Sequence, residues 1–188
     1  MQSGHGRTGE ALWAFSRFGI EPDVVTLGKP MGNGHPVAAV ITRSEVAQAA
    51  VGRTVLFSTF GGNPVSAAAA LAVLDVIDDE RVLDRVRRTG ETLRAALREV
   101  TGRHPAIGDV RGVGLAAGVE IVRPGGRQPD RATAVAVRDG MRDRGVLVGT
   151  TGRAGNVLKI RPPLAFTPTE VPVLVDALDR TLAEQPDR

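Results

Sequence analysis

Residues 24–40 read "VVTLGKPMGNGHPVAAV", and this stretch decides how the whole chain is interpreted. Two apolar runs flank a lysine, three glycines and two prolines. Continuous apolar runs of this length predict buried, parallel-type strands in a sheet that is covered on both faces. Lys29 is therefore expected at the end of a buried strand, in a loop shaped by glycine and proline.

Lysine is rare in this chain, which has only Lys29 and Lys159 while its other cationic side chains are arginine. A neutral lysine amine is a nucleophile that can form an imine with a carbonyl group. The bias towards arginine suggests that Lys29 stands where only a primary amine serves. The alternative is a solvated lysine at the end of a strand, and the residues alone leave both open.

Composition limits the classes of protein that fit. The chain has 188 residues, of which 42% are hydrophobic, and this permits one large domain or two small ones. The pI near 10.4 reflects a net charge of only +3 and few groups that titrate below arginine. Aromatic residues are scarce and acids alternate with the arginines, which argues against binding of nucleic acid. Cysteine is absent, as is any long apolar run, so we expect no disulfide, no membrane span and a cytoplasmic location.

Apolar periodicity and capping residues predict the secondary structure. A boundary near residues 102–106 separates an α/β part from a smaller α+β part. The predicted helices cover residues 10–18, 44–51, 64–79, 80–101, 131–144 and 167–184. The predicted strands cover residues 23–27, 36–42, 107–122 with glycine breaks, 145–150 and 156–160, and residues 54–64 are predicted to form a strand followed by a loop.

The segment "GKPMGNGHP" resembles the region around the cofactor-binding lysine of class III aminotransferases, which are pyridoxal-phosphate enzymes of fold type I. Within that family, the sequence of this segment most resembles the branch of alanine–glyoxylate aminotransferase 2-like enzymes and ethanolamine-phosphate phospho-lyases. Further segments resemble that family in the same order along the chain. They are "QSGHGRTGEALWAF", "FSTFGGNPVSAAAALAVLDVI", "VRGVGLAAGVEIV" and "NVLKIRPPLAFTPTEV".

The resemblance implies an α/β fold built from the C-terminal part of the fold type I large domain, followed by a small α+β domain. The first would span residues 1–102 with a connecting helix, and the second residues 103–188. The implied enzyme is an aminotransferase with pyridoxal 5'-phosphate as cofactor. It would move an amino group from a small-molecule amine or amino acid to a keto acid or aldehyde acceptor. A homodimer with active sites at the interface is also implied, and because the family has a long N-terminal half, the chain is expected to be a fragment.

Five site residues follow from the resemblance. Lys29 would form the Schiff base and shuttle a proton at the substrate α-carbon, while Gln2 would hydrogen-bond the phenolic oxygen of the cofactor. Thr59 would reach the cofactor phosphate of the neighbouring subunit. Lys159 and Arg161 would bind an anionic substrate group, although solvated cations on an edge strand are the alternative for this pair. No histidine spacing indicates a metal site.

Lys159 departs from the family pattern, because many members carry arginine at that position to bind a substrate carboxylate. Lysine is a compact charge and cannot form the two parallel hydrogen bonds of a guanidinium group. This favours, as an alternative, a phospho-lyase that expels phosphate from a phosphorylated amine. A further alternative is an inactive fragment that serves as an assembly or interaction module. The amino donor and acceptor stay open.

Overall fold

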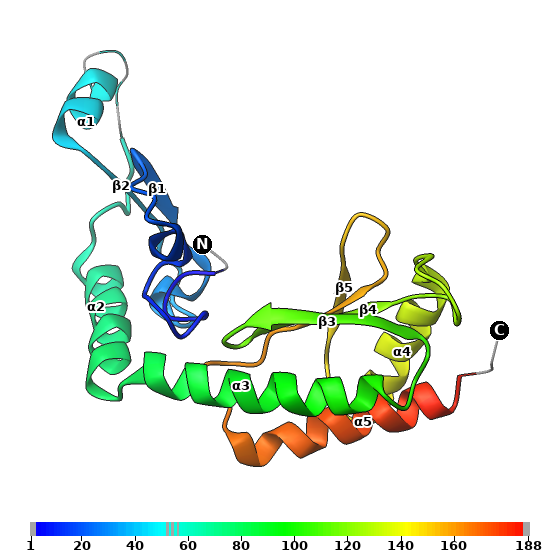
Figure 1. Cartoon of the computed structure of the whole chain (residues 1–188). Coiled ribbons are helices and arrows are strands. Elements are labelled where there is room, and N and C mark those ends of the chain that lie inside the picture. The colour runs from blue at the N-terminus through cyan, green and yellow to red at the C-terminus, as the bar shows by residue number, and fades with distance from the viewer. Residues whose placement is uncertain (1–2, 52, 54, 56, 186–188) are drawn as a thin grey trace. The chain divides into compact units, whose positions relative to one another are not determined.

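The computed structural model describes residues 3–51, 53, 55 and 57–185. The chain divides into two compact units (Figure 1). The first comprises Met1–Gly6 and Glu10–Leu83, and the second comprises Arg7–Gly9 and Asp84–Arg188. The short segment Arg7–Gly9 thus packs with residues that follow it by about a hundred positions.

The first unit is built around a two-stranded antiparallel sheet. Strand β1 (Val24–Leu27) pairs with β2 (Ala39–Thr42), with Val24 opposite Thr42 and Leu27 opposite Ala39. Short 3-10 turns precede and follow β1. The remaining elements of the unit are η1 (Ala14–Phe18), η2 (Lys29–Gly32), α1 (Ser44–Val51) and α2 (Pro64–Asp79).

Three predictions for the first unit are wrong. The strands are antiparallel and largely exposed, with Leu27 the buried residue among them, because two strands alone cannot cover both faces of a sheet. The helix predicted over residues 10–18 is reduced to the turn η1, as short isolated helices are marginal. The strand predicted to begin at residue 54 does not form at the described positions 55, 57 and 58.

Helix α2 spans Pro64–Asp79, the same residues that the sequence predicts. Asn63 lies in extended conformation just before the helix, and its side-chain oxygen accepts a hydrogen bond from the Ser66 amide at 2.8 Å. Pro64 occupies the first turn, where a missing N–H costs little. The helix therefore begins at a position fixed by local chemistry.

The second unit is a four-stranded antiparallel sheet with helices. Helix α3 (Val82–Thr101) leads into it from the end of the first unit, and the strands lie in the order β3-β4-β6-β5. Its further elements are β3 (Ile107–Val113), β4 (Ala116–Ile121), α4 (Arg131–Asp143), β5 (Gly149–Thr151), β6 (Val157–Ile160), η3 (Pro168–Glu170) and α5 (Val171–Ala183).

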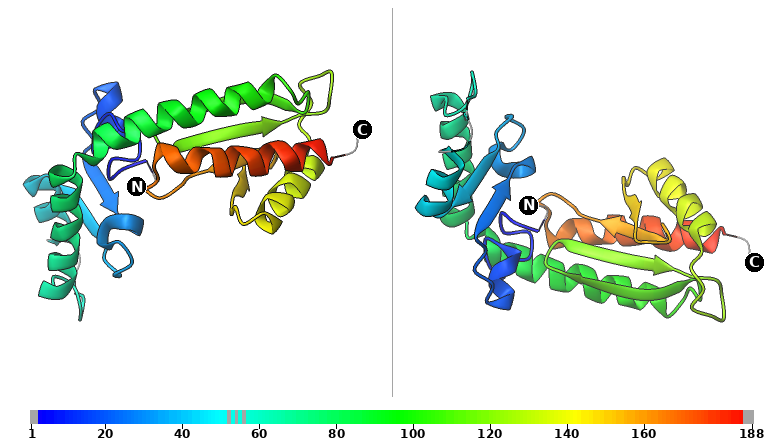
Figure 2. Two further views of the ribbon diagram at one scale, coloured as in Figure 1. Left: turned by 90° about the horizontal axis from the view of Figure 1, so that it is seen from below. Right: turned by 90° about the horizontal axis from the view of Figure 1, so that it is seen from above.

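One face of this sheet forms the core. Burial alternates along β4, where Val119 and Ile121 have no exposed surface, so every second side chain faces the helices. Helices α3 and α5 run side by side along the sheet (Figure 2). The apolar face of α3 that the sequence predicts is buried, and it comprises Val82, Val86, Leu93, Leu97 and Val100.

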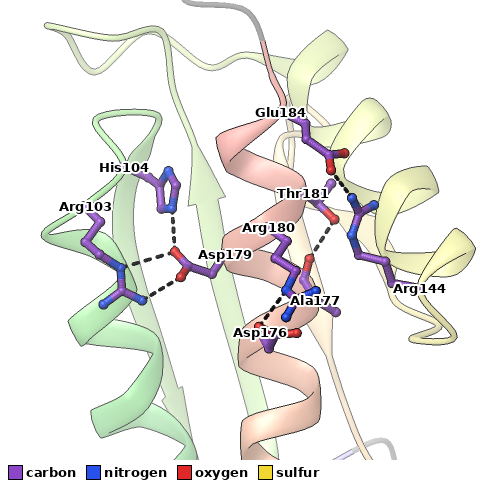
Figure 3. Close-up of polar contacts among 9 residues, drawn as sticks. All are labelled: Arg103, His104, Arg144, Asp176, Ala177, Asp179, Arg180, Thr181 and Glu184. Carbon is purple, nitrogen blue, oxygen red and sulfur yellow. Dashed lines mark hydrogen bonds and ion pairs between the residues drawn. The ribbon is translucent and has the colours of Figure 1, made fainter.

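Polar contacts fasten α5 to its neighbours. Asp179 accepts hydrogen bonds from Arg103 and meets the His104 ring, and Glu184 pairs with Arg144 (Figure 3). At the other end, Thr167 and Glu170 form the predicted capping box. These contacts tie the ends of α3, α4 and α5 into one layer.

The units divide after Leu83, because the buried face of α3 belongs to the second unit. The predicted division into residues 1–102 and 103–188, with α3 as a connecting helix, remains a prediction about functional parts. Within the described part of the chain, no helix combines the length and the apolar character that a bilayer span requires.

Candidate functional site

Lys29 directly follows β1 and has an unusual backbone. Its φ is 52°, in the left-handed region that lysine rarely adopts, and it precedes Pro30, which normally favours an extended residue before it. The turn is closed by a hydrogen bond from the Met31 amide to the Gly28 carbonyl at 3.3 Å. Strained backbone of this kind clusters at functional sites. The backbone of the exposed Lys29 is thus held in a closed turn.

An open hollow of about 520 Å³ lies beside Lys29. Gly34 has free space where a Cβ would stand, so a ligand can approach the backbone there. The hollow is lined by Gly28, Lys29, Gly34, His35, Pro36, Val37 and Ala38. Its lining includes a primary amine, the kind of group that can form an imine with an aldehyde.

His35 joins this hollow to helix α2. Its Nε2 lies 2.8 Å from the Ser66 hydroxyl, which also accepts a hydrogen bond from the Asn63 side-chain amide at 3.0 Å. Thr59 lies exposed in the loop that ends at Asn63. Lys29 and Thr59 thus belong to neighbouring, hydrogen-bonded segments of the first unit.

Lys159 lies on β6 of the second unit, on the sheet face that the helices leave open. Its neighbours across both strands are glycines, Gly118 on β4 and Gly149 on β5. A Cβ on Gly149 would stand 3.3 Å from the Lys159 Cε and 3.7 Å from its Nζ. The lysine side chain therefore lies over Gly149.

Arg161 follows the end of β6 and lines a different hollow. This hollow measures about 510 Å³ and has a largely apolar wall that includes Leu147, Pro162 and Phe166. Lys159 does not line it. The two predicted substrate-binding cations of the second unit therefore have different neighbours: Lys159 lies over Gly149, whereas Arg161 lines the hollow.

The Arg7 side chain is hydrogen-bonded to the backbone next to Arg161. Its guanidinium group donates to the Pro162 carbonyl at 2.5 Å and to the Leu115 carbonyl at 3.2 Å. Burial, and then the nearby Arg161 charge, lower the pKa of Arg7 from its usual value. The Leu115 amide donates back to the Arg7 carbonyl at 3.0 Å. These bonds hold the segment Arg7–Gly9 within the second unit.

The structure places four of the five predicted site residues, and Gln2 lies outside the described residues. Lys29 and Thr59 belong to the first unit, and Lys159 and Arg161 to the second. Sequence reasoning missed Arg7, His35 and the Asn63–Ser66 pair. A signal for the pair existed, because asparagine directly before proline is typical of a helix start, and the asparagine side chain caps the amide three positions later.

A family model of class III aminotransferases matches residues 1–182. The chain belongs to this family, which confirms the resemblance seen in the sequence. The fold prediction is confirmed as well, since the structure matches solved transaminase structures over nearly its whole length. Membership implies pyridoxal phosphate as the cofactor, and the amine and hollow at Lys29 fit this group.

Two curated relatives and one solved structure are among the most similar proteins. Ethanolamine-phosphate phospho-lyase homolog 1 of Caenorhabditis elegans is 44% identical over 97% of this chain and 40% of its own length. Alanine–glyoxylate aminotransferase 2 homolog 2, mitochondrial, of Arabidopsis thaliana is 42% identical over 98% of this chain and 38% of its own length. A phospholyase from Arthrobacter in complex with phosphoethanolamine matches 98% of this chain and 44% of its own, with 42% identity and a TM-score of 0.93. The chain therefore spans about two-fifths of the length of these relatives.

Proposed function

We propose that this chain is the lysine-bearing part of a pyridoxal-phosphate-dependent aminotransferase. The observation that carries the proposal is the placement of Lys29, an exposed amine in a left-handed turn beside a hollow with a glycine-rich rim. The cofactor, when bound, supplies an electron sink for charge that develops on the substrate α-carbon. Lys29 would bond the cofactor aldehyde and later move a proton at the α-carbon.

The other residues would bind and orient. In this proposal Thr59 donates to the cofactor phosphate of a neighbouring subunit, and Gln2 hydrogen-bonds the phenolic oxygen. Lys159 and Arg161 hold an anionic group of the amine or of the keto acid or aldehyde acceptor. Residues 1–102 form the cofactor-binding part and residues 103–188 the small domain of a cytoplasmic homodimer.

A second candidate is a phospho-lyase that acts on a phosphorylated amine. It is supported by Lys159, a compact cation flanked by Gly118 and Gly149 that suits phosphate better than a planar carboxylate. The similarity to a phospholyase with bound phosphoethanolamine points the same way. In this reading Lys159 and Arg161 would hold the phosphate that leaves.

Titration of the chain with pyridoxal phosphate tests the shared part of both candidates. We expect the visible absorbance of a lysine-bound cofactor, lost in Lys29→Arg and kept in the matched variant Lys159→Arg. Equal absorbance in both variants would contradict a special role for Lys29, and none in the unsubstituted chain would favour the inactive interaction module. Release of inorganic phosphate from phosphoethanolamine, without transfer of its amino group, would then select the phospho-lyase.

A further inference from the structure

A continuous hydrogen-bonded path runs from the Lys29 turn to the Thr59 loop. Its first part is a series of turns in the backbone. The amides of Met31, Asn33 and His35 donate to the carbonyls three residues before them, at 3.3, 3.0 and 3.0 Å. Asn33 is itself in the left-handed region, with φ 45°. The backbone from Lys29 to His35 is therefore folded into consecutive hydrogen-bonded turns.

The second part of the path runs through side chains. His35 Nε2 meets the Ser66 hydroxyl at 2.8 Å, and the Asn63 amide group donates to that hydroxyl at 3.0 Å. Because Asn63 Oδ1 accepts from the Ser66 amide, the orientation of the Asn63 side chain is determined. The Ser66 hydroxyl keeps its own proton and a second lone pair for the imidazole.

The last part shapes the loop that contains Thr59. The Asn63 side-chain amide also donates to the Phe60 carbonyl at 2.8 Å, and the Gly61 amide donates to the Ser58 hydroxyl at 3.0 Å. Thr59 lies between these two anchored positions. The backbone on the C-terminal side of Thr59 is thus bonded to Asn63, whose side chain also bonds Ser66, the partner of His35.

We infer that His35 is a positioning residue that couples the Lys29 turn to the Thr59 loop through Ser66 and Asn63. The inference rests on the proposed function, in which Lys29 holds the cofactor of one subunit and Thr59 the cofactor phosphate of the other. The path therefore joins the two active sites of the proposed dimer. His35 suits this role because its far ring nitrogen reaches across the rim of the hollow to α2, while Pro36 restricts the backbone that follows.

Nuclear magnetic resonance of the full chain tests the coupling without any cofactor. In His35→Ala we expect the Thr59 and Gly61 amide signals to shift and the Ser66 amide to exchange with solvent about three- to tenfold faster. In Asn63→Ala we expect the reciprocal shift of the Met31 and Asn33 amides. His35→Gln, whose amide can reach Ser66, should restore the signals of the unsubstituted chain.

Thr42→Val is the matched control, since it removes one side-chain hydrogen bond, to the Asp23 carbonyl, elsewhere in the same unit. Effects of His35→Ala no larger than those of this control would overturn the inference. Faster exchange along the whole of α2 would overturn it too, because that result indicates a general loss of stability.

Borohydride reduction with pyridoxal phosphate on the same variants separates this inference from the proposed function. Absence of a Lys29 adduct in the unsubstituted chain contradicts the proposed function, whereas the amide signals judge the coupling independently. Where the adduct forms, its yield at Lys29 relative to Lys159 should fall in His35→Ala and recover in His35→Gln. An unchanged ratio would overturn the positioning role.

Discussion

The Lys159 side chain lies across Gly149, its partner on the adjacent strand, so that a Cβ at Gly149 would stand 3.3 Å from the lysine Cε. The glycine thereby sets where the ammonium group rests on the open face of the sheet. Because the contact is with the far end of a flexible side chain, an added methyl group moves the lysine rather than the backbone.

We therefore predict that Gly149→Ala displaces the Lys159 ammonium with little change in stability. The chain has two lysines, so selective isotopic labelling of lysine gives one set of signals for each. The Lys159 ε-methylene signal should shift, while the free energy of unfolding changes by less than about 1 kcal/mol. Gly118→Ala is the control, since its Cβ would contact Val157 at 3.0 Å instead. An equal Lys159 shift in both variants would contradict the assignment.

Gly114 is predicted to be essential for fastening Arg7–Gly9 to the second unit. A Cβ at Gly114 would stand 2.4 Å from the Arg7 carbonyl oxygen, and the backbone φ there is 53°. Gly114→Ala should lower the free energy of unfolding by roughly 2–5 kcal/mol, combining overpacking and backbone strain. Urea denaturation followed by circular dichroism measures this.

Gly125→Ala is the matched control for that experiment, because Gly125 has φ 77° but open space around its Cβ position. Gly125→Ala should lower the free energy of unfolding only through the strain of a left-handed backbone, by about 1–2 kcal/mol. Equal losses at the two positions would show that the close approach to Arg7 is not important for stability.

Asp179 is predicted to stabilise the second unit in a pH-dependent way. Hydrogen bonds from Arg103, and then from His104, hold the pKa of Asp179 below its usual value of 3.8. A carboxyl group with a lowered folded pKa stabilises the protein above 3.8, and this contribution is lost as the pH falls through the folded pKa. Asp179→Asn should therefore destabilise at neutral pH and converge with the unsubstituted chain in acid.

The magnitude should be modest, below about 1 kcal/mol, because water screens this partly exposed group. Denaturation midpoints at several pH values provide the measurement. Asp176→Asn, which loses the exposed pair with Arg180 on the same helix, should show less than half that effect. If the loss of stability in Asp179→Asn, relative to the unsubstituted chain, became larger at acid pH, the prediction would be wrong.

The loop before α2 is predicted to contribute to the proposed dimer. Val55, Phe57 and Phe60 lie within six positions of one another and are 89%, 84% and 81% exposed, and large apolar side chains exposed together favour an interaction surface. The double substitution Phe57→Ser and Phe60→Ser should weaken self-association at least about tenfold in analytical ultracentrifugation. Leu147→Ser, at an equally exposed leucine of the second unit, should leave it unchanged. A dimer that survives the double substitution would contradict this role.

Helices governed by local signals could be predicted from the sequence. The start of α2 follows from Asn63 and Pro64, and the apolar face of α3 from the spacing of Val82, Val86 and Leu93. The pairing of β1 with β2 could not be predicted, because apolar content shows which residues avoid water but not which strand lies beside them. Buried and exposed two-stranded sheets therefore look alike in sequence.

The candidate site divides in the same way. The rarity of lysine and the family motif pointed to Lys29, since amine chemistry depends on residue type. The bond from His35 to Ser66 and the bond from Arg7 to the Pro162 carbonyl could not be predicted, because each depends on distances between residues far apart in sequence. The left-handed backbone of Lys29 was not predicted either, because lysine before proline normally favours an extended conformation. Geometry of this kind follows only from the folded chain.

The central claim is that Lys29 carries the cofactor, and peptide mass mapping tests it most directly. The full chain is mixed with pyridoxal phosphate, reduced with borohydride and digested, and the modified lysines are counted. We expect the adduct on the peptide that contains Lys29, far in excess of Lys159, and its loss in Lys29→Ala. Equal labelling of the two lysines, or labelling of Lys159 alone, would contradict the account.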